Sequence, residues 1–418
     1  MQTSMSSEPT IFLPDTTIGI IGGGQLGRMM ALSGRAMGYR LNVLDPDEAA
    51  PARFVADTFF QGSFTDQEAI KRLAQTSDVL VYEFEHIHTD ALEHAARLKP
   101  LPQGVDIVRM AQHRTLEKEY LSRAGFPVAP YVLLHRPKDI MSAIDQLGFP
   151  LIVKTTRGGY DGKGQWRLFS ESDRVPLEDA FETIFARAEA ERRYQDRLGQ
   201  TTHAQTEVPF DTSDSTSDLT RVPLIAERMI PFEKELSVIV ARRADGLSKA
   251  FPVAENIHVN GILRQTIVPA RVPEKIQQTA TSLAEAIAHT FQVVGLLAVE
   301  LFYVSDGTLL VNELAPRPHN SGHYTLDAVS ISQFEQFLRA VTHLPLGEVR
   351  LYSPVVMVNI LGEHLPEVLK RIPTLDPRVR VHLYGKKEAR AGRKMGHLNI
   401  VAENIEEALE IVKTVGVE

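Results

Sequence analysis

The feature that most constrains the fold is a pair of apolar runs that each carry one glutamate. Glu300 lies in the run LLAVELF and Glu313 in the run LLVNELA, and both runs have the composition of buried strands. The link between them contains the Asp-Gly pair 306–307, which is a strong signal for a hairpin. We therefore expect two antiparallel strands that place both carboxylates near one end of the hairpin.

Two carboxylates in such strands need a counter-charge, because burying an unpaired charge is costly. A hard cation supplies one, and Mg²⁺ held by one or two carboxylates usually also binds substrate phosphates. The alternative is that each glutamate forms an ion pair with arginine or lysine. Glu300 and Glu313 therefore predict either a Mg²⁺ site or structural ion pairs, and the rest of the chain must decide.

The composition narrows the class of protein. The chain has 418 residues, of which 43% are hydrophobic, and this length suggests roughly two to four domains. No apolar run reaches the ~18 residues of a membrane helix, and the polar first residues lack the layout of a signal peptide. The absence of cysteine excludes disulfides and thiolate metal sites, and the formal net charge of −8 argues against a general nucleic-acid binder. We expect a cytoplasmic protein without a membrane or nucleic-acid partner.

Residues 16 to about 102 alternate short apolar runs with helical patterns, and a further helix follows. We expect strands at 17–21, 40–44 and 78–82, and helices at 25–37, 89–98 and 115–124. This β-α-β rhythm indicates a doubly wound parallel sheet with helices on both faces. Further along, we expect strands at 150–154, 165–169, 224–227 and 234–240, helices at 177–193, 276–291, 334–342 and 405–412, and a polar surface insertion at 194–220.

A glycine-rich turn follows the first expected strand. The run GGGQLG at 22–27 satisfies G-x-G-x-x-G, and Asp45 ends the next strand 18 residues later, close to the spacing of a ribose-binding acid. This pattern is typical of dinucleotide binding, so a nicotinamide- or flavin-dependent enzyme is one hypothesis. The backbone N–H groups of such a turn accept any phosphate, however, and Gln25 and Arg28 could hold a monophosphate or its sugar.

A second glycine-rich segment, KTTRGGYDGKGQ at 154–165, is more specific. It differs from the P-loop because no serine or threonine follows Lys163. Glycines between two strands let the backbone close over phosphates as a lid, and Lys154 on the entering strand can neutralise the α- and β-phosphates. The alternative is a flexible hairpin loop with solvated lysines.

Two further patterns are weaker. The extended run IAERMI at 225–230, followed by Glu235, can serve as a nucleotide hinge that offers one C=O and one N–H to adenine. A strand carboxylate such as Glu235 is more often solvated or paired. His86 and His88 suggest zinc, but no companion ligand set has the expected spacing.

Taken in order, Lys154, the glycine lid, Glu227, Glu235, Glu300 and the Asn-Glu pair 312–313 resemble an ATP-grasp carboxylate–amine ligase. The resemblance is narrowed by GGGQLGR at 22–28, YEFE at 82–85, GYDGKGQ at 159–165, ENIH at 255–258 and NELAPRPHNSGH at 312–323. Together these segments are similar to the N5-carboxyaminoimidazole ribonucleotide synthetases of purine biosynthesis, from about residue 17 to near the C-terminus. The insertion at 194–220 is longer than that family usually carries.

The resemblance implies a mixed α/β and α+β architecture with an ATP-grasp fold. The expected parts are a flexible tail at 1–15, a doubly wound Rossmann-like domain at 16–118, a small ATP-grasp domain at 119–230 with the lid and the insertion, a large ATP-grasp domain at 231–345 with the metal site, and a small β-rich C-terminal domain at 346–418. The resemblance also implies a homodimer. Fungal members are fused to the mutase that performs the next step, so a fused or a separate mutase is an expected partner.

The resemblance also assigns site residues. It implies that ATP contacts Arg114, Lys154, Gly159, Tyr160, Asp161, Gly162, Lys163, Gly164, Gln165, Glu227, Arg228, Met229, Ile230, Glu235, His258, Asn312 and Glu313. It implies that Mg²⁺ is held by Glu300 and Glu313. Aminoimidazole ribonucleotide would lie by Gln25 and Leu26, near Glu83 and Glu85, with its phosphate close to Lys386, Arg393 and Lys394. Without the resemblance, that basic run would be an ordinary solvated loop.

The implied chemistry is the ATP-dependent carboxylation of the ribonucleotide's exocyclic amine. ATP phosphorylates bicarbonate to carboxyphosphate, which yields CO₂ for attack by the amine, while Mg²⁺ and Lys154 share the phosphate charge. Arg317 and His319 are the expected partners of bicarbonate or carboxyphosphate. Tyr160 and Asp161 would close over the amine, with Asp161 as the proton acceptor.

Other hypotheses have different acceptors or a different class of reaction. Another ATP-grasp ligase, such as a formate-using purine transformylase or a biotin-dependent carboxylase subunit, shares the order of domains and differs in the acceptor site. A nucleotide-binding oxidoreductase would be built on the turn at 22–27. A catalytically inactive binding module is disfavoured, because both glutamates and Lys154 are present.

Overall fold

The computed structural model describes residues 9–85, 87–157, 164–174, 177, 180–186 and 223–417. The lid at 158–163, His86 and the insertion at 194–220 lie outside the described residues. The chain divides into two compact units: Met1–Val108, Lys234–Leu301 and Leu314–Glu418 form the first, and Arg109–Glu233 with Phe302–Glu313 forms the second. In the described part of the chain, no helix is long and apolar enough to cross a membrane.

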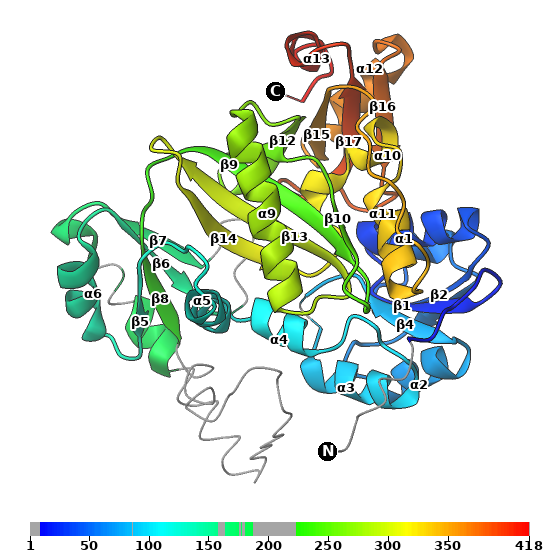
Figure 1. Ribbon diagram of the computed structural model, residues 1–418, viewed down its shortest axis with the longest axis horizontal. Coiled ribbons are helices and arrows are strands. Elements are labelled where there is room, and N and C mark those ends of the chain that lie inside the picture. The colour runs from blue at the N-terminus through cyan, green and yellow to red at the C-terminus, as the bar shows by residue number, and fades with distance from the viewer. Residues whose placement is uncertain are drawn as a thin grey trace. The chain divides into compact units, whose positions relative to one another are not determined.

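The first unit begins with a parallel four-stranded sheet in the order β3-β2-β1-β4, drawn in blue in Figure 1. Its elements are β1 (Thr17–Ile21), α1 (Gln25–Ala36), β2 (Arg40–Asp45), η1 (Pro51–Phe54), β3 (Thr58–Gln61), α2 (Gln67–Gln75), β4 (Val79–Tyr82) and α3 (Thr89–Leu98). Strand β1 is buried because β2 and β4 flank it on both sides. The parallel order confirms the expected doubly wound arrangement.

A nine-stranded sheet has the order β14-β13-β9-β11-β12-β15-β17-β16, with β10 paired to β9. Its strands are β9 (Phe232–Arg242), β10 (Ser248–Ala250), β11 (Ala254–Val259), β12 (Ile262–Val268), β13 (Gly295–Val304), β14 (Leu309–Ala315), β15 (Val355–Leu361), β16 (Val379–Leu383) and β17 (Lys394–Val401). Helix α9 (Glu274–Thr290) buries Ala280, Ala284, Ile287 and Ala288, whose spacing forms one helical face.

This sheet continues into the C-terminal segment without a break. Strand β15 pairs antiparallel with β12, with Gln265 opposite Val358, and then with β17. The remaining helices are α10 (Thr325–Ala328), α11 (Gln333–Val341), α12 (Leu365–Arg371) and α13 (Ile405–Val412), with short turns η3 (Asn320–Gly322) and η4 (Ile372–Thr374). The C-terminal segment is therefore held by backbone hydrogen bonds as well as by its own apolar core, which includes Val356 and Ile400.

The second unit contains a separate antiparallel sheet in the order β5-β8-β6-β7. Its elements are α5 (Arg114–Arg123), β5 (Tyr131–Leu134), α6 (Asp139–Leu147), β6 (Leu151–Thr155), β7 (Gln165–Leu168), η2 (Glu171–Asp173) and β8 (Leu224–Arg228), and α4 (Asp106–Ala111) precedes them. The helix expected at 177–193 is described only at residues 177 and 180–186, which are helical. Lys154 lies in β6, between Gln165 of β7 and Ile225 of β8, so both neighbouring strands fix its position.

The hairpin turn between β13 and β14 forms as the Asp-Gly pair predicts. Val304 N–H donates to Thr308 O, and Gly307 N–H donates to Val304 O, each at 2.9 Å. Gly307 has φ +90°, which favours glycine at this position. The division of the chain into units falls within this hairpin, with Glu300 in the first unit and Glu313 in the second.

Candidate active site

The glycine turn before α1 is occupied by carboxylates of this chain. Gly23 N–H donates to Asp45 Oδ2 at 2.7 Å, and Glu83 accepts from the N–H groups of Gly24 and Gly27. A Cβ on Gly27 would lie 2.4 Å from the carbonyl oxygen of Gly22, which explains the close packing of this turn. A phosphate at these N–H groups, which the sequence left open as an alternative, would have to displace the side chains of Glu83 and Asp45.

Glu83 is a buried acid with an unusual proton affinity. Burial raises the pKa of its carboxyl to about 7, although the N–H groups of Gly27 and Gly24 act in the opposite direction. The guanidinium of Arg317 also lowers the pKa, but it is the weakest of these effects. Near neutral pH Glu83 is thus poised between its protonated and ionised forms.

The basic C-terminal residues lie in the same unit as Glu83. Lys386 Nζ donates to Lys394 O at 2.8 Å and lies 5.6 Å from the centre of the Tyr384 ring. Burial and the charge of Arg393 lower the pKa of Lys386 to about 8, against the opposing effect of the Glu83 carboxylate. The structure therefore brings two of the residues expected at the ribonucleotide, Glu83 and Lys386, within electrostatic range of each other.

The other residues expected at the ribonucleotide have separate roles. Arg393 Nη1 donates to Glu388 O at 3.0 Å, which orients its side chain along the loop. Gln25 is the first residue of α1. The side chain of Leu26 is buried in the apolar core, so its role is packing rather than recognition.

Arg317 and His319 are each bound to a carboxylate. Arg317 donates through Nε and Nη2 to both oxygens of Glu85, the Nη2 bond being 2.8 Å long. His319 Nε2 lies 3.3 Å from Glu300 Oε1. Burial, followed by the charges of Arg317 and Lys394, lowers the pKa of His319 well below its ordinary value, so the ring is neutral. The structure thus places the two expected bicarbonate partners in one cluster with Glu85 and Glu300.

A second expected pair also forms in the first unit. His258 Nδ1 and Glu235 Oε2, from β11 and β9, lie 2.8 Å apart and are each about one-fifth exposed. Burial lowers the pKa of His258, but the hydrogen bond and charge of Glu235 outweigh it, so the net pKa is raised. Two residues expected at ATP therefore meet as a hydrogen-bonded pair.

In the second unit, two lysines hold one buried carboxylate. Glu227 lies 3.1 Å from Lys154 Nζ and 3.4 Å from Lys118 Nζ. Burial opposes ionisation, but the charges of Lys118 and Lys154 prevail and lower the pKa of Glu227 to about 2. Arg114 reaches the same region, because its Nη1 donates to Thr155 O at 2.8 Å. Glu227 therefore acts by fixing Lys154, and its buried carboxylate is not available to adenine.

The hinge at 227–230 is partly used by the fold itself. The N–H groups of Arg228 and Met229 donate to Pro130 O and Pro150 O at 2.9 and 3.1 Å. The Arg228 side chain donates to Leu147 O. An adenine edge that needs an N–H donor must therefore find it elsewhere in the hinge, for example at Ile230.

The lid is described only at its end. Gly164 has φ +69°, and a Cβ there would lie 2.6 Å from Thr155 Oγ1. Gln165 pairs with Lys154 in the β6–β7 ladder. The other residues expected in the lid, Gly159, Tyr160, Asp161, Gly162 and Lys163, lie outside the described residues.

The two expected metal ligands have different environments. Glu300 is 19% exposed at its side chain and faces His319, whereas Glu313 is exposed. The expectation that both carboxylates are buried is wrong for Glu313, so the cost of burial does not by itself demand a cation there. Among the described residues, no group of three or more His, Cys, Asp or Glu side chains could hold a metal ion by itself. Carboxylate oxygens are ligands that suit Mg²⁺, which usually takes its other ligands from water and substrate phosphates.

Sequence reasoning missed Lys118 and the role of Gln333. Lys118 is almost fully buried and donates to the carbonyl oxygens of Val311 and Asn312 as well as facing Glu227. Its spacing of four from Arg114, on the same face of a helix, is the signal that could have revealed it. Gln333 is fully buried and holds both backbone groups of His319, but nothing in its sequence context indicates this.

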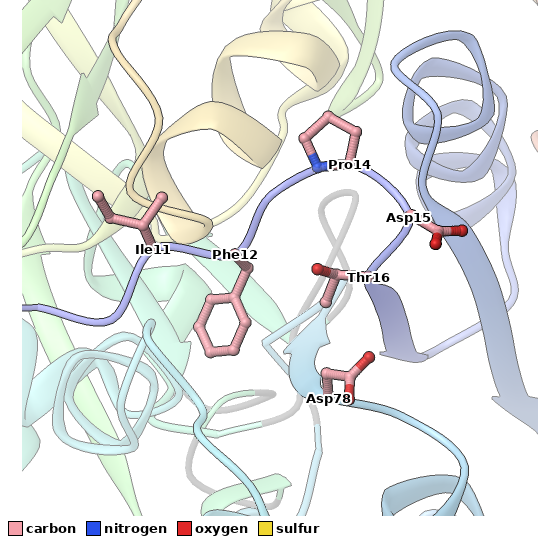
Figure 2. Close-up of a pocket in the computed structure, with 6 residues that line it drawn as sticks. All are labelled: Ile11, Phe12, Pro14, Asp15, Thr16 and Asp78. Carbon is pink, nitrogen blue, oxygen red and sulfur yellow. The ribbon is translucent and has the colours of Figure 1, made fainter.

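The first unit also has a pocket of about 470 Å³, and Figure 2 shows the side chains around it. It is lined by Ile11, Phe12, Pro14, Asp15, Thr16 and Asp78. Asp78 accepts from Thr17 N–H at 2.9 Å, and the carbonyl of Phe12 accepts from the Tyr39 hydroxyl at 2.8 Å. The lining contains none of the expected site residues, and its polar groups serve to attach the N-terminal segment.

Comparison with known families defines the class of protein. Residues 119–190 and 195–334 match the ATP-grasp domain family, and residues 15–112 match the ribonucleotide synthetase preATP-grasp domain. Residues 355–411 match the phosphoribosylaminoimidazole carboxylase C-terminal domain. The chain is an ATP-grasp protein with a preATP-grasp domain before the catalytic fold and a C-terminal domain after it.

Individual relatives narrow the family. The N5-carboxyaminoimidazole ribonucleotide synthase of Bacillus subtilis strain 168 is 42% identical over 96% of this chain and 95% of that protein. A crystal structure of the ADP complex of an N5-carboxyaminoimidazole ribonucleotide synthetase is 46% identical, with a TM-score of 0.86 and 98% of both chains covered. The Aspergillus clavatus enzyme, solved with ADP and 5-aminoimidazole ribonucleotide, is 30% identical with a TM-score of 0.80, over 96% of this chain and 97% of that chain. The chain belongs to the N5-carboxyaminoimidazole ribonucleotide synthase family, which replaces the oxidoreductase hypothesis.

Proposed function

We propose that the chain catalyses the reaction for which its family is named. It joins bicarbonate to the exocyclic amine of 5-aminoimidazole ribonucleotide and converts ATP to ADP and phosphate, as a step of purine biosynthesis. The observation that carries the proposal is the cluster in the first unit where Glu83 and Lys386 interact and Arg317 and His319 are bound to Glu85 and Glu300. A formate-dependent transformylase or a biotin-dependent carboxylase would have a different acceptor site.

The ATP step needs positive charge and accurate positioning rather than covalent chemistry. Lys154, oriented by the buried Glu227, and the nearby Arg114 supply positive charge for the phosphates. Glu235 and His258 form a pair that suits the ribose hydroxyls and the purine. The role of Lys118 is to share the charge of Glu227 and hold the backbone of the strand that carries Asn312.

Bicarbonate is a weak electrophile, so it is activated first. A bicarbonate oxygen attacks the γ-phosphorus of ATP, ADP leaves, and carboxyphosphate forms. Carboxyphosphate releases CO₂ and phosphate, and the amine attacks the carbon of CO₂ and loses a proton. The guanidinium of Arg317 is the group that would orient the bicarbonate and the leaving phosphate. His319 would act through Glu300 instead, because Ser321 and Glu300 already face its two ring nitrogens.

Mg²⁺ is proposed as the cation of the ATP step, where it would neutralise charge on the β- and γ-phosphates. Glu300 and Glu313 are its proposed protein ligands, and Asn312 is their neighbour. The side chain of Glu300 is partly exposed and that of Glu313 is exposed, so both carboxylates are open to a ligand.

Three finer features complete the proposal. The ribonucleotide is bound by Glu83, Gln25 and the basic residues Lys386, Arg393 and Lys394. Asp161 in the lid is the proposed proton acceptor, and Glu83 is a second candidate because its pKa of about 7 suits that task. The chain acts as a cytoplasmic homodimer and passes its product to a mutase, fused or separate; sedimentation of the purified chain tests the dimer.

The test is phosphate release with ATP, Mg²⁺, bicarbonate and 5-aminoimidazole ribonucleotide. We expect release to require both bicarbonate and the ribonucleotide, and formate should not replace bicarbonate. Release that is indifferent to the ribonucleotide would contradict the proposed function.

Replacing Glu313 with alanine tests the metal assignment. We expect Glu313→Ala to reduce turnover by at least about a hundredfold while the thermal unfolding midpoint stays unchanged, since the side chain is exposed. Glu274→Ala, which removes an exposed glutamate from the first turn of α9, is the matched control. Normal turnover in Glu313→Ala would remove Glu313 from the metal site.

A further inference from the structure

A row of buried polar side chains crosses the large sheet of the first unit and ends at Glu300. Its members are Thr266 on β12, Asn256 on β11, Ser237 on β9, and Ser321 and His319 at η3. Thr266, Asn256, Ser237 and Ser321 are each at most 5% exposed. Asn256 lies directly opposite Thr266 in the antiparallel ladder, and β9 is the neighbour of β11 on the other side. Buried polar groups are stable only when they are hydrogen bonded, so the pattern of these bonds is informative.

The hydrogen bonds of this row run in one direction. The Thr266 hydroxyl donates to Asn256 Oδ1 at 3.0 Å, and Asn256 Nδ2 donates to Ser237 Oγ at 2.9 Å. The Ser237 hydroxyl then donates to Ser321 Oγ at 2.9 Å. Because a hydroxyl carries one proton, Ser321 can accept from Ser237 and still donate to His319 Nδ1, which lies 2.8 Å away.

Two donors consequently meet at one nitrogen of His319. Besides the Ser321 hydroxyl, the Ser321 backbone N–H points at His319 Nδ1 from 3.3 Å. In a neutral imidazole, the hydrogen bonds at one nitrogen decide where the proton lies. Nδ1 is an acceptor here, so the proton is on Nε2, 3.3 Å from Glu300 Oε1. The opposite tautomer would turn a ring lone pair toward the carboxylate.

The backbone around His319 is fixed as well. Gln333 Oε1 accepts from the His319 N–H at 2.9 Å, and Gln333 Nε2 donates to the His319 carbonyl at 2.8 Å. A Cβ on Gly322 would lie 2.6 Å from Gln333 Oε1 and 2.3 Å from Ile239 Cδ1, so only glycine allows this close approach. The ring of His319 is thereby held by its backbone on one side and by Ser321 on the other.

We propose that the buried relay of Thr266, Asn256, Ser237 and Ser321 is a positioning device that holds His319 as its Nε2–H tautomer and thereby orients the carboxylate of Glu300. This inference rests on the proposed function, in which Glu300 is a ligand of the cation. A carboxylate that binds a hard cation must present its oxygens in a narrow range of directions, and donors behind the ligand supply that order. A relay of neutral groups does so without a positive charge that would compete with the cation.

The tautomer of His319 can be measured directly in the metal-free protein. Histidine labelled with ¹⁵N in the ring gives different two-bond ¹H–¹⁵N patterns for the two tautomers, and His319→Gln identifies the signal. We expect the Nε2–H pattern in the unmodified chain and a mixture with the Nδ1–H form in Ser321→Ala. Ser237→Ala, which removes the donor to Ser321, should give a smaller change in the same direction.

The control removes an equally buried hydroxyl that lies outside the relay. Thr342, at the end of α11, is fully buried and donates to Leu338 O. Thr342→Val should leave the His319 pattern unchanged. Ser237→Thr keeps the hydroxyl and should restore the pattern of the unmodified chain. Should Ser321→Ala fail to fold, Ser237→Ala carries the same comparison.

The second readout is the Mg²⁺ concentration that gives half-maximal turnover. We expect it to rise about tenfold in Ser321→Ala and less in Ser237→Ala, as is usual for donors behind a metal ligand. The KM for the ribonucleotide should be nearly constant, which separates a positioning role from general damage. An unchanged tautomer, or a Mg²⁺ requirement equal to that of Thr342→Val, would overturn the relay. An inactive unmodified chain would refute the proposed function instead, because the tautomer is measured without turnover.

Discussion

Two buried carboxylates, one in each unit, have opposite proton affinities. Glu83 is 6% exposed and Glu227 is 2% exposed. Burial raises the pKa of Glu83 to about 7, whereas in Glu227 the charges of Lys118 and Lys154 outweigh burial and lower the pKa to about 2. Glu83 accepts its hydrogen bonds from neutral backbone N–H groups, while Glu227 faces two ammonium groups. Hydrogen bonds alone did not keep a buried carboxyl ionised here, but two nearby positive charges did.

The difference matches what each site has to do. The second unit has to present Lys154 in one orientation, and a permanently charged Glu227 fixes it without changing its own protonation. In the proposed function the first unit binds the substrate that carries the amine, and Glu83 can change its protonation near neutral pH. The same residue type therefore serves as a structural anchor in one place and as an adjustable polar group in the other.

The largest expected effect comes from removing the anchor. Glu227→Ala leaves two buried lysines without a counter-charge, so we expect the unfolding free energy of the second unit to fall by about 3–5 kcal/mol. Trp166, the single tryptophan of the chain, packs against the core of that unit, so its fluorescence in a urea titration follows this unit.

The control for this experiment is an exposed ion pair. Glu171→Ala removes an exposed glutamate of the same unit that lies 2.5 Å from Arg174, and such surface pairs contribute at most about 1 kcal/mol. Equal losses in the two variants would show that the lysines around Glu227 are not energetically different from surface lysines.

The next expected effect is that Glu227 and Glu83 change the free energy of unfolding with pH in opposite directions. The ordinary pKa of a glutamate is 4.5, so stability provided by Glu227 is present above pH 4.5 and is lost as the pH falls toward 2. For Glu83 the folded state holds its proton more tightly than the unfolded state, so stability falls as the pH rises from 4.5 to 7 and levels off above that. Each shift corresponds to about 3 kcal/mol.

Each pH dependence is measured by comparing the unmodified chain with one variant. In Glu227→Gln, the free energy of unfolding measured by Trp166 fluorescence should no longer fall below pH 4.5. In Glu83→Gln, the free energy of unfolding measured by near-ultraviolet circular dichroism should no longer fall between pH 4.5 and 7. If the unfolding free energy of Glu83→Gln still falls between pH 4.5 and 7 as in the unmodified chain, the raised pKa of Glu83 is refuted.

A smaller effect is expected from Glu83→Gln at pH 6, where the native carboxyl is largely protonated. The amide –NH₂ cannot accept from a backbone N–H, so one of the bonds to Gly24 and Gly27 is lost. We expect a loss of about 1–3 kcal/mol, and faster amide exchange at Gly24 or Gly27 should accompany it. Glu68→Gln on the surface is the control, and unchanged exchange at both glycines would contradict the assigned geometry.

The smallest expected effect concerns Lys386, which burial and Arg393 bring to a pKa of about 8. Its positive charge is lost as the pH rises through 8, so kcat/KM for the ribonucleotide should fall by up to about tenfold per pH unit above that value. Lys386→Arg keeps its charge and should remove the decline. The exposed neighbour gives the control Lys387→Arg, and a decline that persists in Lys386→Arg would exclude Lys386 as its cause.

Local elements were predictable because their causes are local. The strand expected at 17–21 is β1, the helix expected at 25–37 is α1, and the Asp-Gly turn forms as expected. Apolar periodicity and turn chemistry act over a few residues, and they determine these elements without distant contacts. The pairing of Glu235 with His258 was also within reach, because both had been expected at one nucleotide.

Contacts between distant parts of the chain were not predictable in this way. Glu85 and Arg317 are 232 positions apart, and no sequence pattern around either residue predicts that they form an ion pair. Two further features depend on such contacts. Glu313 lies in an apolar run but is exposed, and the glycine turn that could accept a phosphate is filled by Glu83, which directly follows β4. The exposure of a side chain and the groups that fill a backbone turn both depend on residues that the fold places next to them.

The sequence by itself determined the family, the order of its motifs and the chemistry that those motifs can perform, since residue type and spacing carry that information. Only the tertiary structure decided how each charged group behaves. It made Glu83 an acid with a pKa near 7, Glu227 a permanent anion between two lysines, and His319 a neutral ring that lies 3.3 Å from Glu300. The physical reason is that proton affinity depends on burial and on nearby charges, which come from residues far away in the chain.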